Sequence, residues 1–361
     1  MVWVLLGLSL LVILGGAELF TNGIEWIGEG FGLSEGVVGS VLAAVGTALP
    51  ETLLPLVAIL SGHDAGEEIG TGAILGAPFM LTTLAMVVIA IAVLLAARGE
   101  RRSTDLKFDA AVIQQDLGYF LVMYALATVA GLLDSKPFDY GLVVVLFVGY
   151  VYYVRRHFQS PGEKELEEEA GSEIKALYVW NTLRRFKRSL PVWTKNTSTS
   201  APFVQVAVAL GLIIGGAELF IHAVNDLAEL FDISPLAFSL LVAPVATELP
   251  EKFNSVIWVR RRKDTLALGN MTGAMVFQSS FPVAIGLLLT PWHLEGPALV
   301  AALVALVAGS TLWLQVRFRR RLTAPMLIKR SRCVAPARSS IGGGIAEPQR
   351  LVDVVDGVAV E

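Results

Sequence analysis

The sequence predicts an all-α integral membrane protein built from two inverted repeats, and three observations lead to this fold class. Of the 361 residues, 54% are hydrophobic and 17% are charged, a balance that is typical of membrane proteins. Long apolar stretches recur along most of the chain. The hexapeptide GGAELF at 15–20 returns at 215–220, and the triplet LPE at 49–51 returns at 249–251.

A helix needs about 20 predominantly apolar residues to cross a bilayer. We therefore expect about nine transmembrane helices, near 2–20, 34–60, 69–96, 110–133, 138–154, 202–224, 235–259, 265–290 and 296–316. The first stretch lacks a basic N-terminal region, and its GGAELF end is copied inside the chain. It is therefore predicted to be a mature helix and not a signal peptide.

The distribution of Lys and Arg predicts the orientation, because cytoplasmic flanks collect these residues. They cluster at 98–107, 155–195, 260–263 and 317–350. Threading the helices through these clusters predicts a multi-pass protein of the cell membrane. Its N-terminus would lie outside, and both the loop 158–201 and the C-terminal tail would be cytoplasmic.

These assignments divide the chain into four parts. Residues 1–157 form a first repeat of five helices, 158–201 a cytoplasmic loop, 202–316 a second repeat of four helices, and 317–361 a polar tail. Because five is an odd number, the second repeat enters the bilayer from the opposite face. A tenth helix is missing or degenerate, since no apolar run in the tail is long enough to cross.

The segments GTALPE (46–51) and ATELPE (246–251) place a proline and a glutamate inside apolar stretches. Proline removes a helical hydrogen bond, so backbone oxygens one turn earlier lose a partner. Thr47 and Glu51 stand on one helix face, as do Thr247 and Glu251. Carbonyl, hydroxyl and carboxylate oxygens are ligands for hard cations such as Ca²⁺ and Na⁺.

Glu51 and Glu251 are expected to meet across the pseudo-twofold axis of the repeats. Two neighbouring carboxylates in a low dielectric need compensation by metal ions or protons. If the empty form cannot rearrange, one cation leaves only in exchange for another, which is antiport.

The chain resembles the sodium/calcium exchanger family, the cation:cation antiporters with two inverted repeats, from residue 1 to about 316. The resemblance implies that Glu51 and Glu251 are the central ion ligands, with Thr47 and Thr247 beside them and the carbonyls of Ala44 and Pro244 as further ligands. Some family positions are altered: the turn serines are Ala48 and Glu248, the serines of the following helices are Ala77 and Ala274, and the Asn or Asp positions are Leu81 and Gln278.

Glu248 and Lys252 are four residues apart, on one helix face. We favour a structural ion pair between them. The alternative is that Glu248 joins the site and Lys252 occupies it as a tethered cation.

Other polar residues give weaker signals. Glu18 and Glu218 are expected at the membrane interface, with a role near the ion path as the alternative. Thr82, Thr83, Ser279 and Ser280 could replace the missing serines, although hydroxyls in membrane helices more often serve packing. His63, His157, His222 and His293 are read as surface residues.

The predicted function is secondary active cation antiport, foremost of Na⁺ against Ca²⁺. Antiport of another pair, H⁺ or another metal ion, and a non-transporting scaffold are the alternatives. The sequence has no catalytic aspartate pair, serine dyad or HExxH helix, so an enzyme is not predicted. We expect no covalent cofactor and no nucleic-acid partner; the expected partners are membrane lipid and the transported Ca²⁺ and Na⁺.

Overall fold

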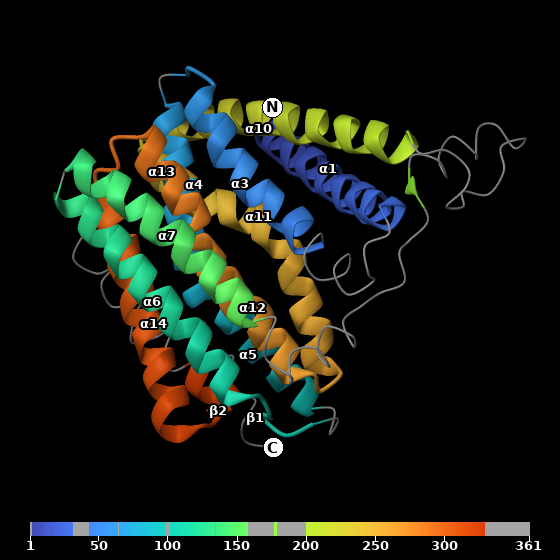
Figure 1. Cartoon of the computed structure of the whole chain (residues 1–361), viewed down its shortest axis with the longest axis vertical. Coiled ribbons are helices and arrows are strands. Elements are labelled where there is room, and N and C mark those ends of the chain that lie inside the picture. Colours follow the sequence, from blue (N-terminus) through green and yellow to red (C-terminus); the bar gives the residue numbers. More distant parts are fainter. Residues whose placement is uncertain are drawn as a thin grey trace, which may run out of the picture.

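The computed structural model describes residues 2–31, 43–63, 65–98, 102–133, 135–157, 177–178 and 200–328. Its architecture is a bundle of helices (Figure 1). Helices α1 and α10 lie side by side along one edge, and α6, α7 and α14 occupy the opposite side, with α4, α11 and α12 between them. The all-α membrane fold predicted from the sequence is confirmed.

Each predicted span that falls on described residues corresponds to helix. The first part of the chain contains α1 (Val2–Gly30), α3 (Ala43–Leu60), α4 (Gly66–Thr82), α5 (Leu84–Arg98), α6 (Ala110–Leu133) and α7 (Lys136–His157). The second contains α10 (Ala201–Phe231), α11 (Pro235–Arg260), α12 (Asp264–Gln278), α13 (Phe281–Leu289) and α14 (Gly296–Arg319). Within the described ranges, seven helical stretches are long and apolar enough to cross a membrane. The predicted spans 34–60 and 235–259 are described only in part, and their described parts include the shorter apolar helices Glu51–Leu60 and Pro235–Val245.

Two predicted spans are broken, and the breaks occupy equivalent positions. Aligning GAILGA (72–77) with GNMTGA (269–274) pairs Thr83 with Ser280. The helix breaks at Thr83 with φ −114° and ψ −83°, and at Ser280 with φ −114° and ψ −74°. The Thr83 hydroxyl donates to the carbonyl of Phe79, and the Ser280 hydroxyl to that of Val276. In both breaks a hydroxyl therefore satisfies a backbone oxygen of its own helix.

The GGAELF helices cross through reciprocal glycine contacts. A Cβ on Gly16 would lie 2.8 Å from Cγ1 of Ile213, and a Cβ on Gly216 would lie 2.8 Å from Cγ1 of Ile13. Each contact maps onto the other by a shift of 200 residues. The helices run antiparallel, since Gly23, later in α1, meets Val206, earlier in α10. This is the geometry that an inverted repeat predicts, and the small residues allow the close approach.

A second close crossing joins the two halves at the centre of the bundle. A Cβ on Gly72 would lie 2.5 Å from the carbonyl oxygen of Leu236, and one on Gly76 would lie 2.2 Å from that of Leu240. The Gly76 contact also includes Cγ of Pro244, at 2.7 Å. The backbone of α11 therefore rests directly on α4, which fixes the position of the second LPE helix.

At each end of the bundle, the structure brings together connecting segments that the predicted orientation places on the same side of the membrane. At the end predicted to be cytoplasmic, the buried Arg102 guanidinium binds the Asp264 carboxylate at 2.7 and 2.8 Å. Strand β1 (Asp105–Leu106) pairs antiparallel with β2 (Leu322–Thr323) at the same end. At the other end, Lys136 Nζ donates to the Thr290 carbonyl at 2.8 Å. These pairings are consistent with the predicted threading, while the choice of outer and inner face stays a prediction.

Some boundaries differ from those predicted. Helix α1 continues to Gly30 and α10 to Phe231, well beyond the apolar stretches. At about 1.5 Å per residue, the 31 residues of α10 exceed a bilayer core of about 30 Å. The predicted loss of the tenth helix falls on 329–361, outside the described residues. Most of the loop 158–201 does as well.

The α4–α11 crossing predicts that Gly76→Ala destabilises the protein, because its Cβ would collide with backbone atoms of α11. We expect a loss of about 1–3 kcal/mol from overpacking, measured as a lower midpoint of thermal unfolding in detergent. Gly273→Ala is the matched control, since Gly273 is the repeat equivalent and its Cβ would meet nothing closer than the Tyr153 hydroxyl at 3.9 Å. Equal midpoints for the two variants would contradict the crossing.

Candidate cation-binding site

Glu51 lies inside the protein on α3. Its side chain is 8% exposed, although it belongs to a helix predicted to cross hydrocarbon. Its neighbours Leu54 and Ala58 pack in a hydrophobic cluster with Ile13 of α1 and Phe220 of α10. Helix α3 contacts α1, α4, α10 and α11. The carboxylate is therefore held in the interior, where a charged group requires compensation by partners or ions.

The second LPE helix contributes another buried acid. Helix α11 runs continuously through Pro244 and Pro250, and Glu248 on it is 0% exposed. The Gln278 side chain, from α12, donates a 3.0 Å hydrogen bond to Glu248 Oε1. Thr247 is also buried, and its hydroxyl donates to the Ala243 carbonyl at 3.3 Å. Three residues predicted for the site, Thr247, Glu248 and Gln278, thus lie on the contacting helices α11 and α12. Glu248 and Gln278 are hydrogen-bonded to each other.

Several predicted ligands fall outside the side chains that the structure describes. The backbone of 43–50 is helical, but nothing is described of the side chains of Ala44 and Thr47. The same is true of Glu251 and Lys252 on α11. The meeting of Glu51 with Glu251 and the Glu248–Lys252 pair therefore stay predictions. What the structure adds is that Glu248 has Gln278 as a partner.

The sequence analysis missed a third buried acid, Asp116 of α6. This residue is fully buried and accepts hydrogen bonds from the Tyr153 hydroxyl of α7, at 3.0 Å, and from the Thr272 hydroxyl of α12. Asp116 therefore ties three helices together, and Thr272 lies in the GNMTGA segment. The signal was present as QQD at 114–116, a polar triplet within an apolar run. An ionisable residue inside a membrane segment is a candidate functional residue on physical grounds alone.

The acids of the GGAELF helices have different surroundings. Glu18 accepts a 2.8 Å hydrogen bond from the Tyr178 hydroxyl. Glu218 lies with His63 and His222, whose rings are 4.7 Å apart. Both histidines are at least partly exposed, as the sequence predicts, but their proximity to each other and to Glu218 was not predicted. His293 lies instead beside Glu295, with Nε2 3.2 Å from its carboxylate.

Comparison with known sequences agrees with this arrangement. The sequence pattern of the family described as sodium/calcium exchanger protein matches residues 1–157 and 201–336, which is most of the chain. The chain belongs to the sodium/calcium exchanger family. As a family member it is a cation antiporter of a multi-pass membrane type, and the resemblance drawn from the LPE and GGAELF segments is confirmed.

Individual relatives of this exchanger are distant in sequence. It is 24% identical over 301 residues to the putative antiporter CaxA of Alkalimonas amylolytica, covering 82% of this chain and 83% of that one. It is 23% identical over 298 residues to the inner membrane protein YrbG of Escherichia coli, covering 81% of each chain.

Solved structures of exchangers share its fold. The H⁺/Ca²⁺ exchanger CAX matches with a TM-score of 0.65 and 16% identity, over 92% of this chain and 80% of that one. The sodium-calcium exchanger NCX_Mj matches with a TM-score of 0.51 and 20% identity, over 95% of this chain and all of that one. At these identities the likeness shows the fold and does not identify the ions.

The Asp116 contacts predict that Asp116→Asn destabilises the exchanger, because the amide replaces one acceptor oxygen by a donor facing a hydroxyl. We expect a loss of about 1–3 kcal/mol, the usual cost of disrupting a buried hydrogen bond to a charged group. Thermal unfolding in detergent measures it, with the exposed Asp105→Asn as the matched control. If the two aspartates contribute equally, Asp116 is not the tie between α6, α7 and α12.

Proposed function

We propose that this exchanger moves Ca²⁺ in one direction and Na⁺ in the other, with Glu51 and Glu251 as its central ligands. The observation that carries the proposal is the burial of acids on both LPE helices, Glu51 on α3 and Glu248 on α11. An ionised carboxylate removed from water requires a cation, a proton or hydrogen bonds to offset its lost hydration. In an antiporter of this family, the transported cation is the natural source of that compensation.

Exchange follows from the same electrostatics. When a cation leaves, it exposes buried negative charge, so the empty form is costly and the next cation must arrive before the site can turn to the other face. Ca²⁺ and two Na⁺ ions carry equal charge, so either load can neutralise two carboxylates. Helices related by an inverted repeat can present one site alternately to the two faces by exchanging their conformations.

The proposed ligand set is rich in carboxylates and poor in hydroxyls. Ca²⁺ takes about 6–8 oxygens and accepts carboxylates in bidentate fashion. Glu51 and Glu251 offer carboxylate oxygens, and Gln278 an amide oxygen. Glu248 adds a third carboxylate in the alternative in which it joins the site, where Lys252 balances the extra charge. The hydroxyls of Thr47 and Thr247 and the carbonyls of Ala44 and Pro244 complete the proposed shell. Bidentate carboxylates can thus offset the family serines that are Ala48, Ala77 and Ala274 here.

A second candidate is antiport of H⁺ against Ca²⁺, and the complete burial of Glu248 favours it, because burial disfavours the charged form of an acid. The Gln278 amide hydrogen-bonds a carboxylate that has no solvent exposure and stands where the family usually has a serine. Such a carboxylate can be neutralised by a proton as well as by Na⁺. In this version Glu248 carries the coupling proton while Glu51 and Glu251 bind Ca²⁺.

Glu51→Gln should reduce Ca²⁺ transport at least about tenfold, because the loss of a charged ligand costs about 1.4 kcal/mol or more of cation binding. The measurement is ⁴⁵Ca²⁺ uptake into proteoliposomes loaded with Na⁺, with Glu251→Gln expected to behave alike. Glu295→Gln, at an exposed carboxylate in a connection, is the matched control. Full uptake by both central variants would contradict the proposal that Glu51 and Glu251 are the central ligands.

The coupling ion is decided by the gradient that drives uptake. With Na⁺ as the coupling ion, an outward Na⁺ gradient drives ⁴⁵Ca²⁺ uptake and an outward H⁺ gradient at constant Na⁺ does not. Proton coupling gives the reverse result, and Glu248→Gln then abolishes the response to pH. The vesicles are clamped with valinomycin and K⁺, so that membrane potential does not drive either reaction.

A further inference from the structure

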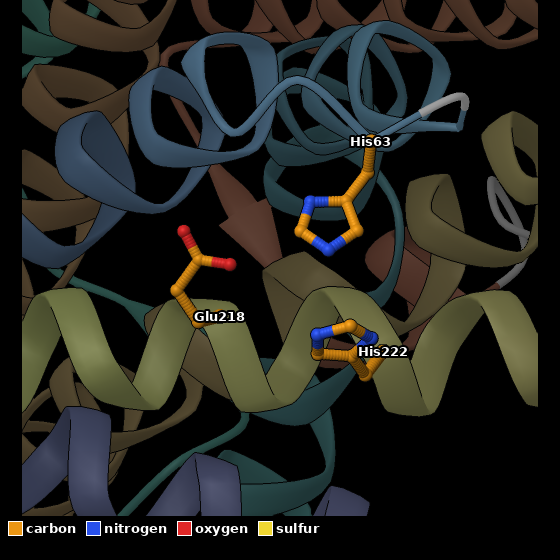
Figure 2. Close-up of side chains that lie close together, drawn as sticks. All are labelled: His63, Glu218 and His222. Atoms are coloured by element: carbon orange, nitrogen blue, oxygen red, sulfur yellow. The ribbon is translucent and has the colours of Figure 1, made fainter.

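Three side chains with metal-binding atoms gather where the turn after α3 meets α10. Figure 2 shows His63 from this turn pointing toward Glu218 and His222 on α10. One ligand atom of each residue can be chosen such that all three lie within 4.8 Å of one another. The two imidazole rings stand nearly perpendicular, at 84°, so they do not stack face to face. We propose that these residues, hereafter the His63 cluster, form a binding site for a transition metal ion of the Zn²⁺ class.

The donor set selects the class of ion. Two imidazoles and one carboxylate suit Zn²⁺ and similar ions, whereas Ca²⁺ and Mg²⁺ prefer oxygen ligands. Around a tetrahedral Zn²⁺ with bonds of about 2.0–2.1 Å, neighbouring donor atoms lie about 3.3 Å apart. Side-chain rotations of modest size bring atoms within 4.8 Å to that spacing. Three protein ligands leave a fourth position for water, chloride or a further ligand.

The backbone holds the three residues in place without a metal. Glu218 and His222 are four residues apart in a continuous helix, so they share a face. In the turn, Gly62 adopts a left-handed φ of +70°, which L side chains rarely adopt. The His63 amide donates to Ser61 Oγ at 3.3 Å, and its carbonyl accepts from the Gly66 amide at 2.9 Å. His63 is therefore fixed by a defined turn.

The symmetry-related place, beside α1, cannot form this site. Glu18 and Asn22 stand at the positions of Glu218 and His222. The segment equivalent to the His63 turn is 260–263, whose residues are all Arg or Lys and cannot share a cation with them. Asn22 instead accepts hydrogen bonds from the Gln205 side chain and the Tyr178 amide. The His63 cluster therefore exists at one end of α10 without a counterpart on α1, and a metal bound there acts on one face of the membrane. The predicted threading makes this the outer face.

A metal in the His63 cluster would connect parts that alternating access must move relative to each other. His63 directly follows α3, the helix of Glu51, and the other two ligands lie on α10, which packs against α1. Bridging these elements stabilises the one arrangement in which the three ligands meet. We therefore expect bound metal to slow exchange, a consequence that rests on the proposed function, whereas metal binding itself does not.

Binding is tested on the full chain in detergent, with any histidine tag removed. Zn²⁺ is titrated by calorimetry, and Co²⁺ is added as a probe whose visible absorption reports tetrahedral coordination. We expect one site, with Zn²⁺ affinity at least about tenfold weaker in His63→Ala and in His222→Ala, the loss of about 1.4 kcal/mol or more. His293→Ala, which removes a histidine beside a single acid, is the matched control. Equal Zn²⁺ affinity in wild type and His63→Ala would overturn the site.

Two further variants separate this proposal from the transport site. Glu51→Gln should keep the Zn²⁺ affinity of the wild type, which shows that the metal binds outside the proposed Ca²⁺ site. Loss of Zn²⁺ binding in Glu51→Gln would overturn the assignment to the His63 cluster. In proteoliposomes, Zn²⁺ should slow wild-type Ca²⁺ uptake, and His63→Ala should need at least about tenfold more Zn²⁺ for the same effect. Unchanged inhibition in His63→Ala would overturn the proposal that metal bound in the His63 cluster slows exchange.

Discussion

The burial of carboxylates among membrane helices is the constraint on which the rest of the structure depends. Glu51, Glu248 and Asp116 are all buried, and in hydrocarbon their hydration must be replaced. For Asp116 the fold itself replaces the lost hydration, because hydroxyls from two other helices donate hydrogen bonds to its carboxylate. Glu248 in turn accepts a hydrogen bond from the Gln278 amide of the neighbouring helix.

The close crossings of the bundle follow from the same requirement. Buried polar groups need neighbouring helices near enough to supply partners, and a large side chain at a crossing would hold those helices apart. Gly16 and Gly216 solve this for α1 and α10, and Gly72 and Gly76 solve it for α4 and α11. These glycines therefore set the distance between the crossing helices. The crossing of α4 and α11 in particular places Pro244 and Glu248 near the middle of the protein.

The sequence predicted those features that repeat or that depend on composition. The spans, the GGAELF repeat and the family all follow from apolar length and from motifs at a constant offset. The breaks at Thr83 and Ser280 were not predicted, because both lie inside long apolar runs. Pro282, in the first turn of α13, is a local signal for the second break that the sequence prediction did not use. Asp116 and the His63 cluster were missed for another reason. Thr272 lies 156 positions from Asp116, and Glu218 lies 155 positions (218 − 63) from His63, so only the fold brings these residues together.

The two halves share a framework and differ in the polar groups placed on it. Glu248 and Gln278 bind each other, whereas their repeat equivalents Ala48 and Leu81 are both apolar. The two halves therefore differ by a whole contacting pair and not by a single residue. The His63 cluster likewise has no equivalent on α1. In an ideally symmetric exchanger, the inward-facing and outward-facing forms would have equal energies apart from the effects of ions. The polar pair Glu248–Gln278 lies only on α11 and α12, so we expect the two forms of this protein to differ in energy. The surroundings of Glu248 change when the two repeats exchange their conformations, whereas the apolar pair Ala48 and Leu81 carries no charge that needs compensation. If Glu51 and Glu251 form the proposed shared centre, we expect this asymmetry to favour one of the two faces when no ion is bound.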